Sequence, residues 1–572
     1  MVHDKMTRWP NISAALLVLI IAGISALNAQ QSPADLILMN GKIITVDQRF
    51  SIAQAVAIKG DRIVAVGNNQ EIARLAGPAT RKLDLKGKAV IPGLIDNHMH
   101  LLRAGQTWQL EVRLDGVDSR KQALGMLRAR AKTLGPAKWV YTIGGWTTDQ
   151  FVDNKKPFTR EELDAAIPAN PVAIQESYYA TFLNSRALQE LGITDGSPDP
   201  AWLPKGAVVR DAAGRPTGMI KGDMPAVRPI AAKLPRVSDD EIGASSLKLI
   251  EDMNRAGLTA FGVPGCDSKL SQMYRGWADR GQLNVRVFCI DGFPADTPDQ
   301  VDKILPQISH IKLFQGDDYL NQIFYGESVY GPVNDPMFLL KSDPKPEQME
   351  QWRRIATEIA KDRLSLHVHV SLENTMDAFL DQIEVINKEY PVRNLRWVLA
   401  HDTQLNAQAL DRMKRLGLYA AIHPWATING GIFRQIYGDR AYDMPALATI
   451  QNSGILWGFG SDGSAANQVH PFTTLWFAVT GKMVGGTKVI RQTISREDAL
   501  IAHTRNNAFF LFEENNLGSI QPGKFADMLV LDRDYLTVPE DQIKDIKSLI
   551  TIIGGRIAYQ DESKEVSVLR DN

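Results

Sequence analysis

The stretch "VIPGLIDNHMH", residues 90–100, places two histidines two positions apart, directly after an apolar run and a Pro-Gly pair. Successive side chains of a strand point to opposite faces, so His98 and His100 share one face. Two imidazoles on one short segment can hold one cation. The pair alone is a weak sign, because most strand-end histidines are simply hydrogen-bonded, and a metal site needs further ligands from elsewhere in the chain.

The chain around this stretch alternates apolar segments of strand length with helical stretches. The strand candidates are "PVAIQES", "LTAFGV", "NVRVFCI", "HIKLFQG", "LSLHVHV", "RWVLAHD", "LYAAIHP" and "ILWGFGSDG", and the helical stretches include 239–256, 346–362, 374–389 and 405–416. No Gly-rich phosphate motif marks an open doubly wound sheet. With about eight such strands the rhythm predicts an α/β fold, a (β/α)₈ TIM barrel.

Both ends of the chain show short antiparallel strands separated by turn signals, at 35–90 and again at 518–560. Neither end can close a core alone, so we expect one small composite β-sandwich built from both. The predicted boundaries are 32–90 and 516–565 for the two sandwich parts and 91–515 for the barrel. Residues 137–235 are too long for one βα unit and are predicted to be an insertion over the barrel mouth.

Charge and composition narrow the class of partner. The chain has 572 residues with 64 basic and 65 acidic side chains, so no excess field favours nucleic acid or an anionic membrane. A small-molecule substrate is therefore expected, and homo-oligomers stay open. Basic residues, an apolar run and a small-residue exit within residues 1–29 predict a cleaved secretory signal, no stable membrane span after cleavage, and a periplasmic or secreted protein. The alternative is an uncleaved N-terminal anchor.

The two cysteines, Cys266 and Cys289, lie in segments that look internal. We expect core residues rather than a disulfide framework, and their spacing is not that of a thiolate metal site. A bound metal would then use nitrogen and oxygen ligands.

Further ligand candidates stand at later strand ends. They are His369, His401 and Asp462. The carboxyl ends of all barrel strands meet at one face, so these side chains are predicted to converge on His98 and His100. Together they form a nitrogen and oxygen set suited to a divalent cation such as Zn²⁺, with one or two ions.

At this point the chain resembles the amidohydrolase superfamily, and specifically its YtcJ-like (amidohydrolase-3) branch. The resemblance rests on "VIPGLIDNHMH", "WVYTIGGW", "HIKLFQGD", "LSLHVHVSLENTMDAFLD", "LRWVLAHDTQL", "GFGSDGS" and the tail "IAHTRNNAFFLFEENNLGSIQPGKFADMLVLD". It covers nearly the whole chain after the signal. It implies a metal-dependent hydrolase in which the barrel carries the site.

The resemblance also implies individual roles. His98, His100, His369, His401 and Asp462 match metal ligands at the ends of the first, fifth, sixth and eighth strands. Lys312 matches a strand-end lysine that can be carboxylated to bridge two metals; the alternative is an unmodified lysine and one metal only. Catalytic roles then fall to Asp462 as general base, to His401 as a ligand or an oxyanion donor, and to Lys312 through the metals.

The predicted substrate contacts are Trp146, Tyr179, Trp425 and His423. Two departures from relatives, "HVSLENT" for "HAIGDRA" and Tyr179 in place of a histidine, make transfer of a substrate unsafe. Residues 315–345 have the texture of a loop that covers the site.

The predicted reaction is hydrolysis of a non-peptide C–N bond, an amide or N-acyl group, by metal-activated water. A second reading is a one-metal deaminase or an ester or lactone hydrolase. A third, from another class, is a catalytically inactive periplasmic ligand-binding protein.

Overall fold

The computed structural model describes residues 32–266, 268–563 and 567–569, so the predicted signal at 1–29 lies outside the described residues. Eight parallel strands form one sheet in chain order: β8 (Leu94–Asp96), β14 (Leu258–Pro264), β15 (Arg286–Ile290), β16 (Leu320–Glu327), β17 (Leu366–Val370), β18 (Val398–His401), β19 (Tyr419–Ile422) and β20 (Trp457–Phe459). The ends of this sheet meet, because Asn97 N donates to Phe459 O at 3.2 Å and Asp462 N to His98 O at 2.8 Å. The predicted barrel is confirmed.

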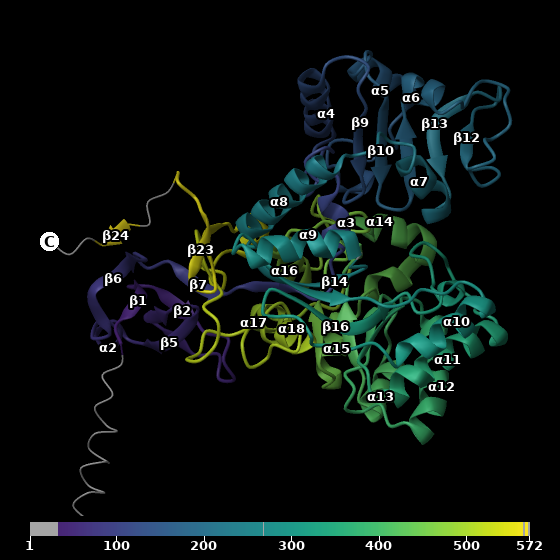
Figure 1. Ribbon diagram of the computed structural model, residues 1–572. Helices are drawn as coiled ribbons and strands as arrows, with labels where there is room; N and C mark the ends of the chain where they lie inside the picture. Colours follow the sequence, from purple (N-terminus) through teal and green to yellow (C-terminus); the bar gives the residue numbers. More distant parts are fainter. Residues whose placement is uncertain (1–31, 267, 564–566, 570–572) are drawn as a thin grey trace, which may run out of the picture.

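Helices surround this barrel (Figure 1). They are α3 (Leu101–Gly105), α8 (Asp239–Ala256), α9 (Ser268–Asp279), α10 (Pro298–Ile308), α11 (Pro346–Lys361), α12 (Glu373–Glu389), α13 (Ala407–Leu416), α14 (Ala426–Tyr437), α15 (Leu447–Ser453), α16 (Pro471–Thr480), α17 (Arg496–Ala502) and α18 (Arg505–Phe510). Helix α11 shows why they pack: Met349, Trp352, Ile355 and Ile359 recur at spacings of three and four and are all buried. Among the described residues, none of the helices has the length and apolarity needed to cross a membrane.

The alternation of side chains along a strand decides which residues reach the barrel interior. In β17, Leu366, Val368 and Val370 pack into the large core shared with the helices. His367 and His369 occupy the alternate positions, so they point to the other face of the strand. The sequence "LHVHV" thus places apolar groups outward under the helices and two imidazoles inward.

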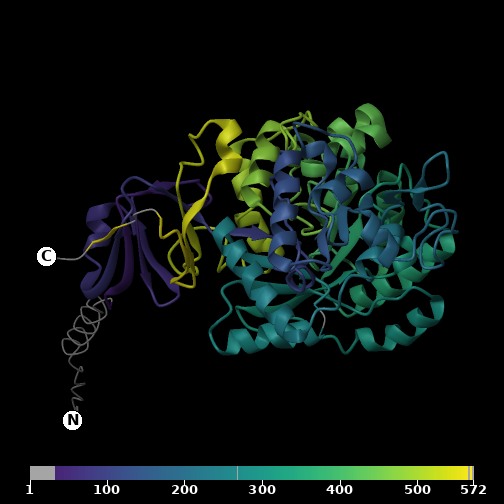
Figure 2. The same cartoon turned by 90° about the horizontal axis from the view of Figure 1, so that it is seen from above.

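A composite β-sandwich stands beside the barrel and is built from strands of the N-terminal and the C-terminal parts of the chain, as Figures 1 and 2 show. One sheet has the order β24-β6-β1-β4-β5, with β1 (Ala34–Met39), β4 (Ala55–Lys59), β5 (Arg62–Gly67), β6 (Ala76–Asp84) and β24 (Ser567–Leu569); α2 (Asn69–Ala73) links β5 to β6. The other has the order β23-β22-β21-β7-β2-β3, with β2 (Lys42–Ile44), β3 (Ile52–Ala53), β7 (Ala89–Pro92), β21 (Met528–Leu531), β22 (Ser548–Ile553) and β23 (Arg556–Gln560). The predicted joining of the two chain ends is confirmed.

The insertion forms a separate layer over one end of the barrel (Figure 1). Its sheet has the order β12-β13-β11-β10-β9, with β9 (Val140–Ile143), β10 (Val172–Glu176), β11 (Ala180–Leu183), β12 (Val208–Arg210) and β13 (Pro216–Lys221). The helices α4 (Arg120–Leu134), α5 (Arg160–Ala166), α6 (Ser185–Glu190) and α7 (Met224–Ala231) flank this sheet. Helix α4 starts before residue 137 yet shares a core with β9 and β10. In Figure 1, α7 lies on the side that faces the barrel.

Cys266 and Cys289 form a disulfide, which corrects the expectation of two unbonded core cysteines. Strands β14 and β15 are parallel neighbours in which Val263 pairs with Cys289. Cys266 follows the end of β14 and therefore lies beside Cys289, with 5.7 Å between the two Cα atoms. The pairing depends on strand adjacency, which a separation of 23 residues did not reveal.

Candidate metal centre

Histidines and carboxylates from five barrel strands meet at the mouth that the insertion covers. His98 and His100 follow β8, His369 lies on β17, His401 ends β18, and Asp462 follows β20. The ligand atoms form groups whose members lie within 4.8 Å of one another: His98, His100 and Glu327 in one, and Glu327, His369 and His401 in another. The five histidine and aspartate positions predicted from the sequence are therefore brought together by the barrel.

Glu327, the last residue of β16, stands between the two halves of the cluster. Its Oε1 lies 3.2 Å from His369 Nδ1 and 3.0 Å from His401 Nε2. Its Oε2 lies 3.6 Å from His98 Nε2 and 3.8 Å from His100 Nε2. Each carboxylate oxygen thus faces its own pair of imidazoles, which is the arrangement of a carboxylate that bridges two cations.

The electrostatics of Glu327 agree with that position. Burial acts to raise the pKa of this carboxyl, but His98 and the hydrogen-bonding rings of His369 and His401 hold the pKa well below its usual range. Glu327 is therefore an anion in the middle of a buried nitrogen cluster.

The donor set fits a divalent metal. His98 Nε2 is buried and has no hydrogen-bond partner, although its ring points at Glu327 and Asp462. Imidazole nitrogens and carboxylate oxygens are the ligands that zinc takes when thiolates are absent. Residues His98, His100, Asp462 and Glu327 would hold one ion, and His369, His401 and Glu327 a second.

The structure corrects the prediction for Lys312. This residue is exposed and lies in the connection between α10 and β16, before the strand begins at Leu320. The end of the fourth barrel strand is Glu327, so an ordinary carboxylate stands where a carboxylated lysine was expected. The sequence signal that could have found it is "LNQIFYGE", a strand-length apolar segment that ends in an acid.

Two further histidines lie beneath the predicted ligands. His367 Nε2 lies 2.9 Å from His98 Nδ1, and His423 Nδ1 lies 2.6 Å from His401 Nδ1. Each supports the ring of a ligand from the side away from Glu327. His423 is buried, with 1% of its surface exposed, so the prediction that it contacts substrate is wrong. Because both ring nitrogens of His401 are engaged, His401 fits the role of ligand better than that of oxyanion donor.

Asp335 fixes the ring of His369. Nε2 of His369 lies 2.7 Å from the backbone oxygen of Asp335 and 3.2 Å from its Oδ1, and both atoms are acceptors. Burial acts to lower the pKa of His369, but the hydrogen bonds to Asp335 and Glu327 hold this pKa well above its usual range. A cation between Nδ1 and Glu327 would displace the Nδ1 proton, and Asp335 would keep the other proton on Nε2. The carboxylate is itself held by the backbone N–H groups of Ser371 and Leu372 at 2.7 to 3.0 Å. Sequence reasoning missed this residue.

Asp462 is aimed into the cluster by Trp425. Trp425 Nε1 donates to Asp462 Oδ2 at 2.9 Å, while Oδ1 lies 3.2 Å from His100 Nε2. The indole also stacks on the ring of His401, with 4.8 Å between centroids. Trp425 was predicted to contact substrate, and the structure places it against the predicted general base; only 2% of it is exposed.

The insertion holds the loop that follows Asp462. Gly145 N donates to Ala465 O at 3.0 Å, Ser177 Oγ to Ala466 O at 3.0 Å, and an Arg113 guanidinium nitrogen to Ser464 O at 3.2 Å. Gly144 has φ +65°, and a Cβ there would lie 2.2 Å from Ala465 O, so only glycine permits this approach. The insertion thus holds the loop after Asp462 as well as covering the mouth.

The predicted substrate contacts separate into two environments. Trp146 is fully buried in the core of the insertion against Phe151 and Phe158, so the prediction that it lines the pocket is wrong. Tyr179 is half-buried at the hairpin between β10 and β11, and its ring contacts Phe338 of the segment after β16. That segment, residues 328–345, is the part of the predicted covering loop that lies outside a strand.

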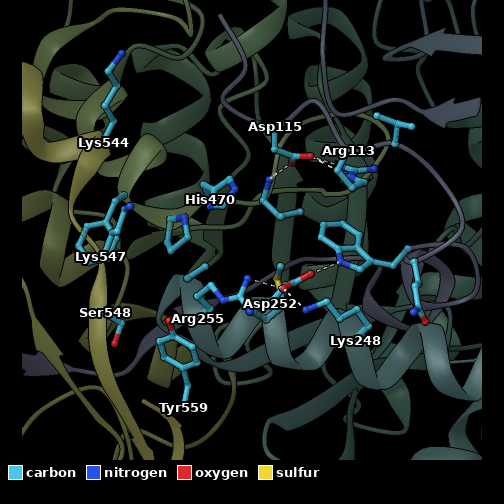
Figure 3. A pocket seen from close by; sticks show the side chains of 18 of the residues that line it. Arg113, Asp115, Lys248, Asp252, Arg255, His470, Lys544, Lys547, Ser548 and Tyr559 are labelled. Atoms are coloured by element: carbon cyan, nitrogen blue, oxygen red, sulfur yellow. Dashed lines mark hydrogen bonds and ion pairs between the residues drawn. The ribbon is translucent and has the colours of Figure 1, made fainter. Parts of the chain in front are cut away.

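A cavity of about 1210 Å³ lies outside the mouth, between α8, the start of α16 and strands β22 and β23. Figure 3 shows the charges that line its α8 wall. Asp252 pairs there with Lys248 at 3.0 Å and with Arg255 at 3.3 Å. His470, a strand-end histidine of the sequence, lines this cavity rather than the metal centre.

Comparisons with known proteins agree with this geometry. The sequence profile of the amidohydrolase family matches residues 81–559. The chain is 26% identical over 553 residues to an N-substituted formamide deformylase of Arthrobacter pascens, covering 92% of this chain and 98% of that protein. It is 25% identical over 552 residues to the putative amidohydrolase YtcJ of Bacillus subtilis, covering 91% and 98%.

A solved structure shows the same fold. An uncharacterized metal-dependent hydrolase from Pyrococcus horikoshii superposes with a TM-score of 0.60 at 21% identity, covering 88% of this chain and 99% of that one. The profile match spans most of the chain, including every residue of the candidate centre. The chain therefore belongs to the amidohydrolase family, in its YtcJ-like branch.

Proposed function

We propose that the protein hydrolyses a non-peptide C–N bond, an amide or N-acyl group, at a two-zinc centre. The observation that carries the proposal is Glu327, whose two oxygens each face a separate pair of histidines. Two further facts support it. Asp462 closes one of the two ligand sets, and a relative with 26% identity over nearly its whole length is named an N-substituted formamide deformylase.

The chain's own groups divide the work. When bound, the divalent cations polarise the amide carbonyl and make water acidic enough to react near neutral pH. Asp462, held by Trp425 at 2.9 Å, takes the proton of the attacking water. The same carboxylate then returns this proton to the leaving nitrogen. His367, His423 and Asp335 keep the ligand rings in place, so that the groups need no reorganisation as charge develops.

The test uses the purified full chain with N-phenethylformamide as substrate. We expect release of formate and phenethylamine, about two zinc ions per chain, and loss of activity on Asp462→Asn by about 10²-fold to 10⁴-fold while the metal is retained. Glu327→Gln should lose bound metal, because an amide nitrogen then faces one pair of histidines. Lys312→Gln is the matched control and should keep both metal and activity, because Lys312 is exposed outside the cluster.

Product analysis separates the neighbouring reactions. Ammonia from amino-heterocycles, or acid from esters and lactones without amide turnover, would replace the amide assignment by one of those reactions. An Asp462→Asn variant as active as the wild type would refute the general-base role. A protein that binds metal but turns over no amide, ester or amino-heterocycle would refute a hydrolytic function.

We also propose that the protein is exported to an oxidising compartment. The pattern of residues 1–29 supports this location, and so does the Cys266–Cys289 disulfide, since disulfides persist mainly outside the cytosol. Cell fractionation of the tagged full chain, with N-terminal sequencing of the mature product, tests both export and cleavage. Recovery of intact chain in the cytosol alone would contradict the proposal.

A further inference from the structure

Three cations gather around two adjacent tyrosines at the hairpin between β10 and β11. An Arg103 guanidinium nitrogen donates to Tyr178 Oη at 3.3 Å, and Arg228 lies over the Tyr178 ring at 5.9 Å from its centroid. Lys221 Nζ lies over the Tyr179 ring at 4.6 Å. The cations come from three elements, namely α3, α7 and the end of β13. We call this group the tyrosine–cation cluster.

The tyrosine–cation cluster borders the metal centre. Arg103 lies on helix α3, three residues after the predicted ligand His100, which is the N-cap residue of this helix. The two residues are therefore neighbours, about one helical turn apart. Ser177, next to Tyr178, donates to Ala466 in the loop that follows Asp462. The tyrosines are therefore tied to both sides of the mouth.

The positive charge of this cluster is not balanced locally. Within the described residues, Arg103, Lys221 and Arg228 form no ion pair, whereas most other arginines of the insertion do. Asp223 lies close enough for Arg228 to lower the pKa of its carboxyl, but it forms no ion pair with Arg228. Burial raises the pKa of the Asp223 carboxyl, and its Oδ2 has no hydrogen-bond partner. All three cations are exposed, so solvent and a ligand can reach them.

Aromatic side chains lie between the tyrosine–cation cluster and the metal centre. Tyr179 contacts Phe338 with 5.6 Å between ring centroids, and Phe338 contacts Phe433 at 6.1 Å. Phe433 lies on α14, whose first turn follows Trp425 at the metal centre. Eight residues of helix separate Trp425 from Phe433, which corresponds to about 12 Å. Phe433 is itself buried, so a ligand at the mouth meets the half-buried ring of Phe338 on one side and the cations at the rim.

We propose that the substrate is an N-acyl compound that carries a carboxylate, or a comparable anion, beside an apolar group, and that the tyrosine–cation cluster binds the anion. This substrate class rests on the proposed amide hydrolysis. The scissile group lies at the metal centre, the apolar group lies against Phe338, and the anion accepts hydrogen bonds from Arg103 with Lys221 and Arg228 near it.

The test compares two substrates that differ only in the charge. N-formylphenylalanine, in both enantiomers, carries the carboxylate, and N-phenethylformamide lacks it. We expect kcat/KM to be higher for one enantiomer of the acid, and to fall with added salt only for the acid. Arg103→Gln should lower kcat/KM for the acid by about 10-fold to 100-fold, mainly through KM, and leave the neutral amide unchanged. Lys221→Gln and Arg228→Gln should give smaller losses, and Lys132→Gln, an exposed cation of α4, none.

Binding to Asp462→Asn protein, measured by calorimetry, tests the cluster without turnover. N-formylphenylalanine should bind more tightly than the neutral amide, and a further Arg103→Gln change should remove the difference. Equal binding of acid and amide, or equal effects of Arg103→Gln on both, would refute the anion site while amide hydrolysis stands. Preferential binding of the acid without hydrolysis of either compound would refute the proposed reaction and keep the anion site.

Discussion

Asp335→Asn tests how the second metal position is built. The carboxylate presents Oδ1 to His369 Nε2 at 3.2 Å and Oδ2 to Leu372 N at 2.7 Å. An asparagine of the same size can keep its oxygen on the backbone N–H groups of Ser371 and Leu372. Its NH₂ group must then face His369 Nε2, a donor that already binds the backbone oxygen of residue 335. The substitution therefore replaces an attractive contact by two opposed donors, without opening a cavity.

The expected magnitude follows from the contact that is lost. A hydrogen bond to a charged group contributes about 1.5–3 kcal/mol, and loss of a partner behind a metal ligand lowers metal affinity by about 10-fold to 100-fold. Only the ion held by His369 and His401 should weaken, because His98 and His100 are supported by other residues. The unfolding midpoint of the metal-free protein should also fall, because the same contact with His369 is lost there, although the N–H groups at the start of α12 keep an acceptor.

The assay is titration of metal-free protein with Zn²⁺ against a competing chelator, which resolves two binding steps. Wild type should show two steps, and Asp335→Asn should show an unchanged first step and a weakened second one. Asp343→Asn is the matched control, because Asp343 lies in the same segment with 91% of its side chain exposed. Two wild-type steps in Asp335→Asn protein would refute the argument that this carboxylate orients His369.

Two further predictions concern stability. Burial raises the pKa of Glu176 to about 7, so the carboxyl keeps its proton in the folded state up to that pH, whereas the unfolded chain releases it near pH 4.5. This carboxyl therefore destabilises the fold progressively as the pH rises from 4.5 to 7. Glu176→Gln keeps the oxygen that accepts hydrogen bonds from Thr148 N and Oγ1. In urea unfolding, this variant should be about 3 kcal/mol more stable than wild type above pH 7 and equally stable below pH 4.5. A stability difference that does not change with pH would contradict the prediction. The double variant Cys266→Ser/Cys289→Ser should lower the free energy of unfolding by about 3 kcal/mol, because the disulfide closes a loop of 23 residues. A reductant should lower the stability of the wild type and leave that of the double variant unchanged. No loss of stability in either experiment would show that the disulfide does not stabilise the fold.

The barrel could be predicted because its signals are local and its geometry is general. His367 and His369 share a face of β17 because of the period of two along a strand, whereas His98 and His100 lie just after β8, which ends at Asp96. Their convergence with Asp462 follows from the single carboxyl end that parallel strands share. Neither step needs knowledge of a particular side-chain contact.

Lys312 shows where such reasoning fails. "HIKLFQGD" alternates polar and apolar residues, which is also the pattern of a short strand. In the structure α10 ends at Ile308, and the connection to β16 contains this stretch. The strand begins at Leu320 and ends at Glu327, so the fourth barrel strand lies after the stretch that was predicted to form it. A period of two over four residues does not distinguish an irregular connection from a strand.

The contacts that escaped prediction all depend on packing between elements distant in sequence. Cys266 meets Cys289 because β14 and β15 are neighbours, and Asp335 meets His369 because the segment after β16 folds back over β17. Trp146, an aromatic in a loop, was expected at the mouth, but the insertion has a core of its own that needs large apolar side chains. No local pattern carries this information.

The stretch from β16 to residue 345 joins ligand geometry to substrate recognition. It supplies Glu327 between the histidine pairs, Asp335 behind His369, and Phe338 against Tyr179 at the rim. Asp335 and Phe338 are only three residues apart in one connection, so the residue that contacts Tyr179 lies beside the partner of a metal-binding ring. The same short segment therefore contributes both to substrate recognition at the mouth and to binding of the second ion. A variant in this segment should be tested for substrate selectivity and for metal affinity together.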